Sequence, residues 1–166
     1  MDAACAMCGR SRDAHNRHVR FRLPDPVLAA PLRERTRGTW MSHDDAESSV
    51  MMQVPEVGHF VRVLLPITLI GGDTLTFGIW LGVAPEDFHR AFAQWWAPTY
   101  PDLVLEGHIA NDVQPWGLLA RPGCAVVRNP QATPYLARST DSLTEQVLTR
   151  HWPHDEVLDA LPETLR

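Results

Sequence analysis

Two stretches near the middle of the chain alternate between apolar and polar positions. They are HFVRVLLPIT at 59–68 and TLTFGIWLGV at 74–83, and glycines lie between them. A period of two predicts β-strands, and glycines between strands predict a tight turn, so we expect a hairpin here. One face of the second strand is the expected core face and carries Leu75, Phe77, Ile79, Leu81 and Val83. The opposite face carries Thr74, Thr76, Gly78, Trp80 and Gly82.

The period changes to that of a helix directly after the hairpin. Pro85 stands at a first-turn position, and the acidic Glu86 and Asp87 follow it near the positive helix end. The pattern predicts an amphipathic helix of about three turns over 85–97. Its apolar stripe is expected to cover the apolar face of the hairpin and consists of Phe88, Phe92, Trp95 and Trp96.

The remaining patterns predict shorter elements. Strands are expected at 48–54, 103–111 and 123–129, with an edge strand at 133–139. Ser142 and Glu145 form a capping box that predicts a C-terminal helix, and a second short helix is expected after Pro153. Three prolines between 23 and 31 predict an irregular connection that at most opens a short helix at Pro31.

This order of elements is typical of an α+β fold with a mainly antiparallel sheet packed on one face by an amphipathic helix. A length of 166 residues suits a single domain. We expect residues 1–22 to form an arm, 23–47 an irregular connection, and 48–166 the sheet and helices.

Composition narrows the possible partners and the compartment. A net charge of −5 without a long basic run argues against nucleic-acid binding. The apolar run at 63–70 is too short to cross a membrane, and the N-terminus lacks the apolar segment of a signal peptide. Three cysteines without an export signal favour reduced thiols and a cytoplasmic location.

The sharpest chemical signal is CAMCGRSRDAHNRH at 5–18. Cys5 and Cys8 have the spacing that lets two sulfurs reach one tetrahedral ion, and Gly9 lets the backbone curl behind them. His15 and His18 are three residues apart and would share one face of a helical turn, which completes a Cys2His2 set for zinc. The alternatives are free thiols beside surface histidines, or a redox pair.

A second group of candidates lies on the face of the sheet opposite the expected core. If the strands at 74–83 and 103–111 are neighbours, Trp80 and Arg62 form a ligand-binding surface, and Glu106, His108 and Asp112 supply acid and base groups. The alternative is an ordinary sheet face whose tryptophan is covered by the N-terminal arm. Common nucleophile, metalloprotease and nucleotide motifs are absent from the sequence.

The chain also resembles a bacterial family of unknown function, number 2199. The resemblance rests on CAMCG, on FGIWLGVAPEDFHRAFAQW and on LEGHIAND. It implies a cytosolic bacterial protein with a metal knuckle. Typical members carry a histidine where this chain has Arg12 and a cysteine where it has Val50 or Met51. The resemblance therefore implies either that the remaining ligands have moved to His15 and His18 or that the metal is lost.

These observations predict a cytosolic zinc-binding protein that binds a protein partner or a small molecule. The alternative function is a small metabolic enzyme that uses the acid and base groups on the Trp80 face.

Overall fold

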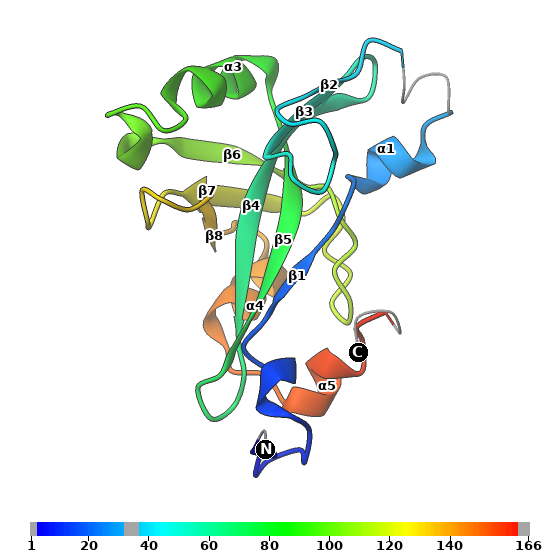
Figure 1. Ribbon diagram of the computed structural model, residues 1–166, viewed down its shortest axis with the longest axis vertical. Helices are drawn as coiled ribbons and strands as arrows, with labels where there is room; N and C mark the ends of the chain where they lie inside the picture. The colour runs from blue at the N-terminus through cyan, green and yellow to red at the C-terminus, as the bar shows by residue number, and fades with distance from the viewer. Residues whose placement is uncertain (1–2, 32–36, 163–166) are drawn as a thin grey trace.

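The computed structural model describes residues 3–31 and 37–162 (Figure 1). Its centre is the predicted hairpin. Strands β4 (Gly58–Thr68) and β5 (Thr74–Val83) pair in antiparallel register from His59 opposite Val83 to Thr68 opposite Thr74. Gly71 and Gly72 in the turn have φ angles of 99° and 98°, a region that favours glycine. The hairpin prediction is confirmed.

Five strands close into a continuous sheet around this hairpin. They follow one another in the order β5-β6-β7-β8-β4, and β4 pairs again with β5. The strand after 133, expected at an edge, pairs with both β7 and β4 and completes the ring. The three further members of the ring are β6 (Val104–Ile109), β7 (Pro122–Val126) and β8 (Tyr135–Arg138).

Strands β6 and β7 run across β4 and β5 (Figure 1). Glycine occupies two close contacts at this crossing. A Cβ atom on Gly107 would lie 2.1 Å from the carbonyl oxygen of Gly82, and one on Gly123 would lie 2.6 Å from a methyl carbon of Leu136. The contact at Gly107 is with backbone and excludes any side chain, so β5 and β6 approach this closely only because residue 107 is glycine. At Gly123 the Leu136 side chain would have to shift to make room.

The interior of the closed sheet is the main hydrophobic core. Four residues of the predicted core face of β5 are fully enclosed, and Val83 is partly buried. The same cluster includes side chains from the other strands of the ring and from both C-terminal helices, among them Val61, Val63, Leu65, Leu105, Ala125, Leu136, Val147 and Val157. The period of two therefore predicted the correct inner face.

The outer face of the hairpin is also buried, which corrects the expectation of an open polar surface there. Trp80 and Arg62 have exposed fractions of 0% and 1%. A second cluster covers this face with Val27, Ala46, Met52, Val54, Phe60 and Ala110. The elements before the hairpin supply part of this cover through α1 (Asp25–Ala29), β2 (Trp40–Met41) and β3 (Met51–Val54). Strand β1 (His18–Arg20) instead pairs beside β5 and buries Val19 in the main core.

Arg62 is the centre of this second layer. Its guanidinium donates to the carbonyl oxygens of Ser49 and Ala46 at 2.9 Å and of Phe21 at 2.8 Å, and it lies 4.1 Å from the centre of the Trp80 ring. Burial lowers the pKa of Arg62 to about 9, with a smaller effect from Arg20, so the group stays charged at neutral pH. Arg62 thus holds the covering segment against the sheet.

The helix after the hairpin forms, but its buried stripe is narrower than expected. Helix α3 (Pro85–Gln94) buries Phe88 and Ala91, while Phe92 is 60% exposed. Trp96 lies beyond the helix end with a φ angle of 59° and is 56% exposed. The helix contacts the sheet through positions three residues apart, so Phe92 falls at the edge of the contact, where its ring meets Trp40.

The C-terminal region is helical as predicted. Asp141 caps α4 through the backbone N–H of Thr144, one residue before the expected Ser142, and Glu145 instead accepts from the N–H of Ser139. The expected irregular connection contains a helix earlier than predicted, because Pro26 stands in the first turn of α1, where its missing N–H costs no hydrogen bond. The segment after Pro31, where a helix was expected, lies outside the described residues. Among residues 3–31 and 37–162, the other helices are α4 (Ser142–Thr149), α5 (His154–Leu158) and the 3-10 turns η1 (Arg12–Ala14) and η2 (Tyr100–Asp102).

The two phenylalanines of α3 provide a matched test of this packing. Replacing Phe88 with alanine is expected to lower the free energy of unfolding by about 3–5 kcal/mol, because a buried ring leaves a cavity. Replacing Phe92 is expected to cost less than about 1.5 kcal/mol, the size of one aromatic pair contact. Urea unfolding measures both values, and equal losses would contradict the observed orientation of the helix.

Arg62 allows a second test. The variant Arg62→Met leaves the carbonyls of Phe21, Ala46 and Ser49 without their donor, so we expect the free energy of unfolding to fall by at least about 3 kcal/mol. The exposed Arg128→Met serves as the control and should change stability by less than about 1 kcal/mol, the size of its exposed contact with the Tyr135 ring. If Arg62 were a ligand-binding side chain, its replacement would leave stability near that of the control.

Candidate functional site

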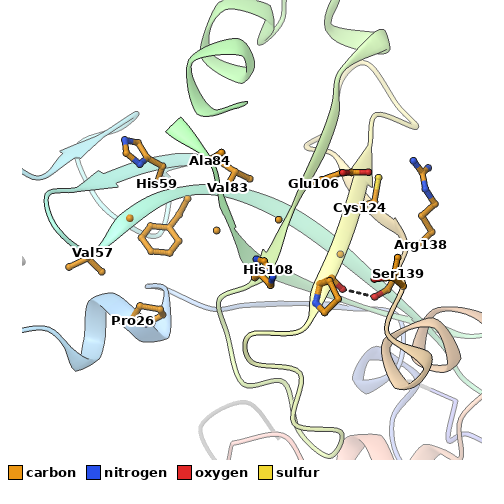
Figure 2. A pocket seen from close by; sticks show the side chains of 17 residues that line it. Pro26, Val57, His59, Val83, Ala84, Glu106, His108, Cys124, Arg138 and Ser139 are labelled. Atoms are coloured by element: carbon orange, nitrogen blue, oxygen red, sulfur yellow. Dashed lines mark hydrogen bonds between the residues drawn. The ribbon is translucent and has the colours of Figure 1, made fainter. Parts of the chain in front are cut away.

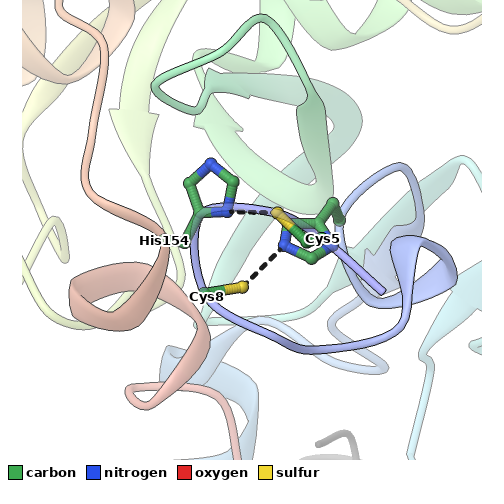
Figure 3. Close-up of side chains that lie close together, drawn as sticks. Cys5, Cys8 and His154 are labelled. Carbon is green, nitrogen blue, oxygen red and sulfur yellow. Dashed lines mark hydrogen bonds between the residues drawn. The ribbon is translucent and has the colours of Figure 1, made fainter. Parts of the chain in front are cut away.

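Four possible metal ligands from the two ends of the chain converge beside the β4–β5 turn. They are Cys5, Cys8, His15 and His154, and their ligand atoms all lie within 4.8 Å of one another. Figure 3 shows Cys5 and Cys8 on the N-terminal loop facing His154, the first residue of α5. Two thiols and two imidazoles at this spacing form a Cys2His2 group that can hold a metal ion.

The cysteine loop is held in shape by its own backbone. The N–H of Gly9 donates to the carbonyl of Cys5, and the N–H of Cys5 donates to the carbonyl of Arg10, both at 2.8 Å. Gly9 has a φ angle of 73°, which a residue with a side chain adopts only with strain. The loop therefore curls back, as the Cys-x-x-Cys-Gly pattern predicts, and brings both sulfurs to one side.

Backbone carbonyls orient both histidines for ligation. Nδ1 of His15 lies 3.0 Å from the carbonyl oxygen of Ser11, and Nε2 of His154 lies 2.5 Å from that of Ile70. A carbonyl can only accept, so each of these nitrogens carries the proton and donates it. The other nitrogen of each ring faces a cysteine and is the one placed to bind a metal. Metal-binding histidines are commonly held in this way.

The distances across the group fit tetrahedral zinc. Sγ of Cys8 is 3.1 Å from Nε2 of His15, and Sγ of Cys5 is 3.5 Å from Nδ1 of His154. Zinc bonds of about 2.3 Å to sulfur and about 2.0–2.1 Å to nitrogen, at a tetrahedral angle, put sulfur and nitrogen roughly 3.5 Å apart. These two sulfur–nitrogen distances match that value within about 0.4 Å, and the spread of up to 4.8 Å across the whole group is closed by small side-chain movements.

The surroundings favour thiolate and enclose the group. The backbone N–H of Met7 points at Sγ of Cys5 from 3.4 Å and is the largest of the effects that lower the pKa of this thiol. His15 is fully buried, Cys5 and His154 are buried, and Cys8 is half-buried. Arg10 pairs with Asp159, at the end of α5, and so fastens the loop to this helix.

The fourth member of this group is His154 and not the predicted His18. His15 and His18 could share a face only in a continuing helical turn, but the 3-10 turn η1 ends at Ala14 and the chain enters β1 at His18. The side chain of His18 is exposed and lies outside the group. His154 is separated from Cys5 by 149 positions, so no local spacing pointed to it.

The resemblance pointed to two further positions, which lie outside the group. Arg12 is exposed on η1, and Met51 is buried in the main core. The four-residue group is complete without them.

The candidates on the outer face of the sheet separate into three locations. Trp80 and Arg62 are enclosed in the second core, as described above. Asp112 is an exposed residue beyond β6 whose carboxylate accepts from Gln114. Glu106 and His108 are exposed on β6 and line a cavity of about 780 Å³ (Figure 2).

This cavity contains residues that the sequence did not single out for function. Cys124, Arg138 and His59 line it together with Glu106 and His108. Burial raises the pKa of the Cys124 thiol and lowers that of the His59 imidazole, so both favour the neutral form. The alternation along the strand placed Glu106 and His108 on one face. Only the closed sheet brings Arg138 of β8 into the same cavity.

Within the described parts of the chain, no helix is long and apolar enough to cross a membrane. No curated protein and no solved structure matches the chain. A family model described as "uncharacterized protein conserved in bacteria (DUF2199)" matches residues 4–153. The match spans most of the chain and includes Cys5, Cys8 and His15. The chain therefore belongs to this uncharacterized bacterial family.

Proposed function

We propose that this protein is a cytosolic zinc-binding protein in which Cys5, Cys8, His15 and His154 hold one structural zinc ion. The observation that carries the proposal is the convergence of four ligand atoms within 4.8 Å from the two ends of the chain. Two sulfurs and two imidazole nitrogens in a tetrahedral arrangement favour zinc over magnesium or calcium, which prefer oxygen ligands.

A structural role is supported by the number of ligands and by their burial. Catalytic zinc sites keep one coordination position open for water or substrate, whereas four protein ligands fill a tetrahedron. His15, with an exposed fraction of 0%, leaves no path for a substrate from its side. Zinc would thus fasten the N-terminal loop to α5 and to the β4–β5 turn, and its binding energy would add to folding stability.

The thiols also support the proposed location. Cys5, Cys8 and Cys124 are all free, and reduced thiols persist in the cytosol. The enzyme alternative loses two of its proposed residues, because Trp80 and Arg62 are enclosed and bond within the protein.

Metal content tests the proposal directly. Protein purified under reducing conditions is expected to contain about one zinc per chain, and the double variant Cys5→Ser, Cys8→Ser is expected to contain none, because serine is a poor zinc ligand. Cys124→Ser is the control, since this thiol lies outside the group, and it should keep its zinc. Elemental analysis measures all three, and metal-free wild-type protein would overturn the proposal.

The identity of the fourth ligand gives an independent test. His154→Ala removes a ligand and is expected to weaken zinc binding by more than about a hundredfold, above the loss caused by changing a residue that only supports a ligand, while His18→Ala should leave affinity unchanged. Cobalt substitution provides the readout, because the visible spectrum of Co²⁺ reports tetrahedral coordination by sulfur and nitrogen. If the His18 variant lost the tetrahedral spectrum and the His154 variant kept it, His18 and not His154 would be the fourth ligand.

A further inference from the structure

The cavity on the outside of the closed sheet is separate from the metal centre, since none of its lining residues is a member of the Cys2His2 group. Its volume of about 780 Å³ lies within the range of pockets that bind small molecules. Figure 2 shows that its two ends differ in chemistry. Pro26 and Val57 supply apolar surface at one end, and Glu106 and Arg138 supply charge at the other. Phe60, close to Val57 in the chain, also lines the cavity.

The charged end is built by strand register. Glu106 of β6 stands opposite Cys124 of β7, which stands opposite Arg138 of β8. The three side chains therefore form a row across neighbouring strands. With strands about 4.8 Å apart, the backbones at Glu106 and Arg138 are separated by roughly 10 Å. This separation leaves room for a small charged group on either side of the neutral Cys124 thiol.

The two charges at this end are not used by the fold. In the described part of the chain, neither the Glu106 carboxylate nor the Arg138 guanidinium has an ion-pair partner, whereas Arg10, Arg90 and Arg121 all do. The two residues lie on either side of Cys124, and no ion pair joins them. A cation and an anion held apart in one cavity are complementary to a molecule that carries both charges.

We propose that this cavity binds a small zwitterion with an apolar body, an amino acid or short peptide, with its carboxylate on Arg138 and its ammonium group on Glu106. The planar guanidinium matches a carboxylate through two parallel hydrogen bonds. A phosphate or dicarboxylate would bring a second negative charge close to Glu106, and a simple amine would be repelled by Arg138. The apolar end at Phe60 and Val57 would take the apolar side chain.

Gly82 connects the two ends of the cavity. It pairs with Phe60 on one side and with His108 on the other, and it lines the cavity without a side chain. A Cβ atom added there would make only ordinary contacts, at 3.5 Å to the carbonyl oxygen of His108 and 3.7 Å to the Phe60 ring. A larger side chain at Gly82 is therefore compatible with the backbone and would fill the space that the ligand needs.

Three matched ligands test the charge requirement on the purified full-length chain. L-Phenylalanine carries both charges, 3-phenylpropanoate lacks the ammonium group, and 2-phenylethylamine lacks the carboxylate. Chemical shifts of backbone amides are expected to move at Gly82, Glu106 and Arg138, with L-phenylalanine or its dipeptide binding at least about tenfold more tightly than either analogue. The proposal would be overturned if 3-phenylpropanoate or 2-phenylethylamine bound as tightly as L-phenylalanine. It would also be overturned if neither L-phenylalanine nor its dipeptide shifted these amides up to its solubility limit.

Variants locate the site. Arg138→Gln and Glu106→Gln are each expected to weaken binding about tenfold or more, and Gly82→Leu is expected to abolish it by filling the cavity. Arg128→Gln, an exposed arginine outside the cavity, is the control and should bind normally. The dispersion of the amide spectrum checks that each variant is folded. If Gly82→Leu fails to fold, Arg138→Gln and Glu106→Gln, both at exposed positions, still test the site. Unchanged affinity in Arg138→Gln would overturn the proposal.

Discussion

The close approach of Gly82 and Gly107 is the constraint on which the architecture depends. A backbone that passes within contact distance of another leaves no room for a Cβ atom, and glycine at position 107 is the condition for this crossing. Because β6 can then turn across β5, β7 and β8 follow it around, and β8 returns to pair with β4. The closed interior holds the main core, and the same bend forms the outer cavity between Phe60 and Arg138.

Closure of the sheet also sets the position of the Cys2His2 group. The β4–β5 turn projects from one end of the ring, and both chain ends return to it (Figure 1). The N–H of Ile70 donates to the carbonyl of Trp152, and the carbonyl of Ile70 accepts from His154. Asn16 bonds Asp73 and Thr74 from the N-terminal side. An ion bound here would join segments far apart in sequence, where a crosslink removes much of the entropy of the unfolded chain.

Two arginines show how the same side chain serves different purposes. The guanidinium of Arg62 is surrounded by backbone carbonyls and a tryptophan ring, and its hydrogen bonds hold residues 46–49 against the hairpin. Arg138 is exposed at the cavity with its charge uncompensated in the described part of the chain. Burial and hydrogen bonding, and not residue type, separate the structural cation from the one available to a ligand.

The sequence by itself determined the local features of this protein. The alternation at 59–83 set the hairpin and its inner face, the glycine after Cys8 set the curl of the cysteine loop, and Pro85 with its acidic neighbours set the start of α3. Each depends on residues that are near one another in the chain, so short-range spacing carries the information.

Only the tertiary structure decided which distant residues meet. His154 replaced His18 as the fourth member of the metal group because the chain extends into β1 after His15, and the folded C-terminus supplies the nearer imidazole. The second face of the hairpin became core because residues 21–54 fold over it, and Phe92 stayed exposed because the helix contacts the sheet through Phe88 and Ala91. These outcomes depend on packing between segments that are remote in sequence, which local periodicity does not encode.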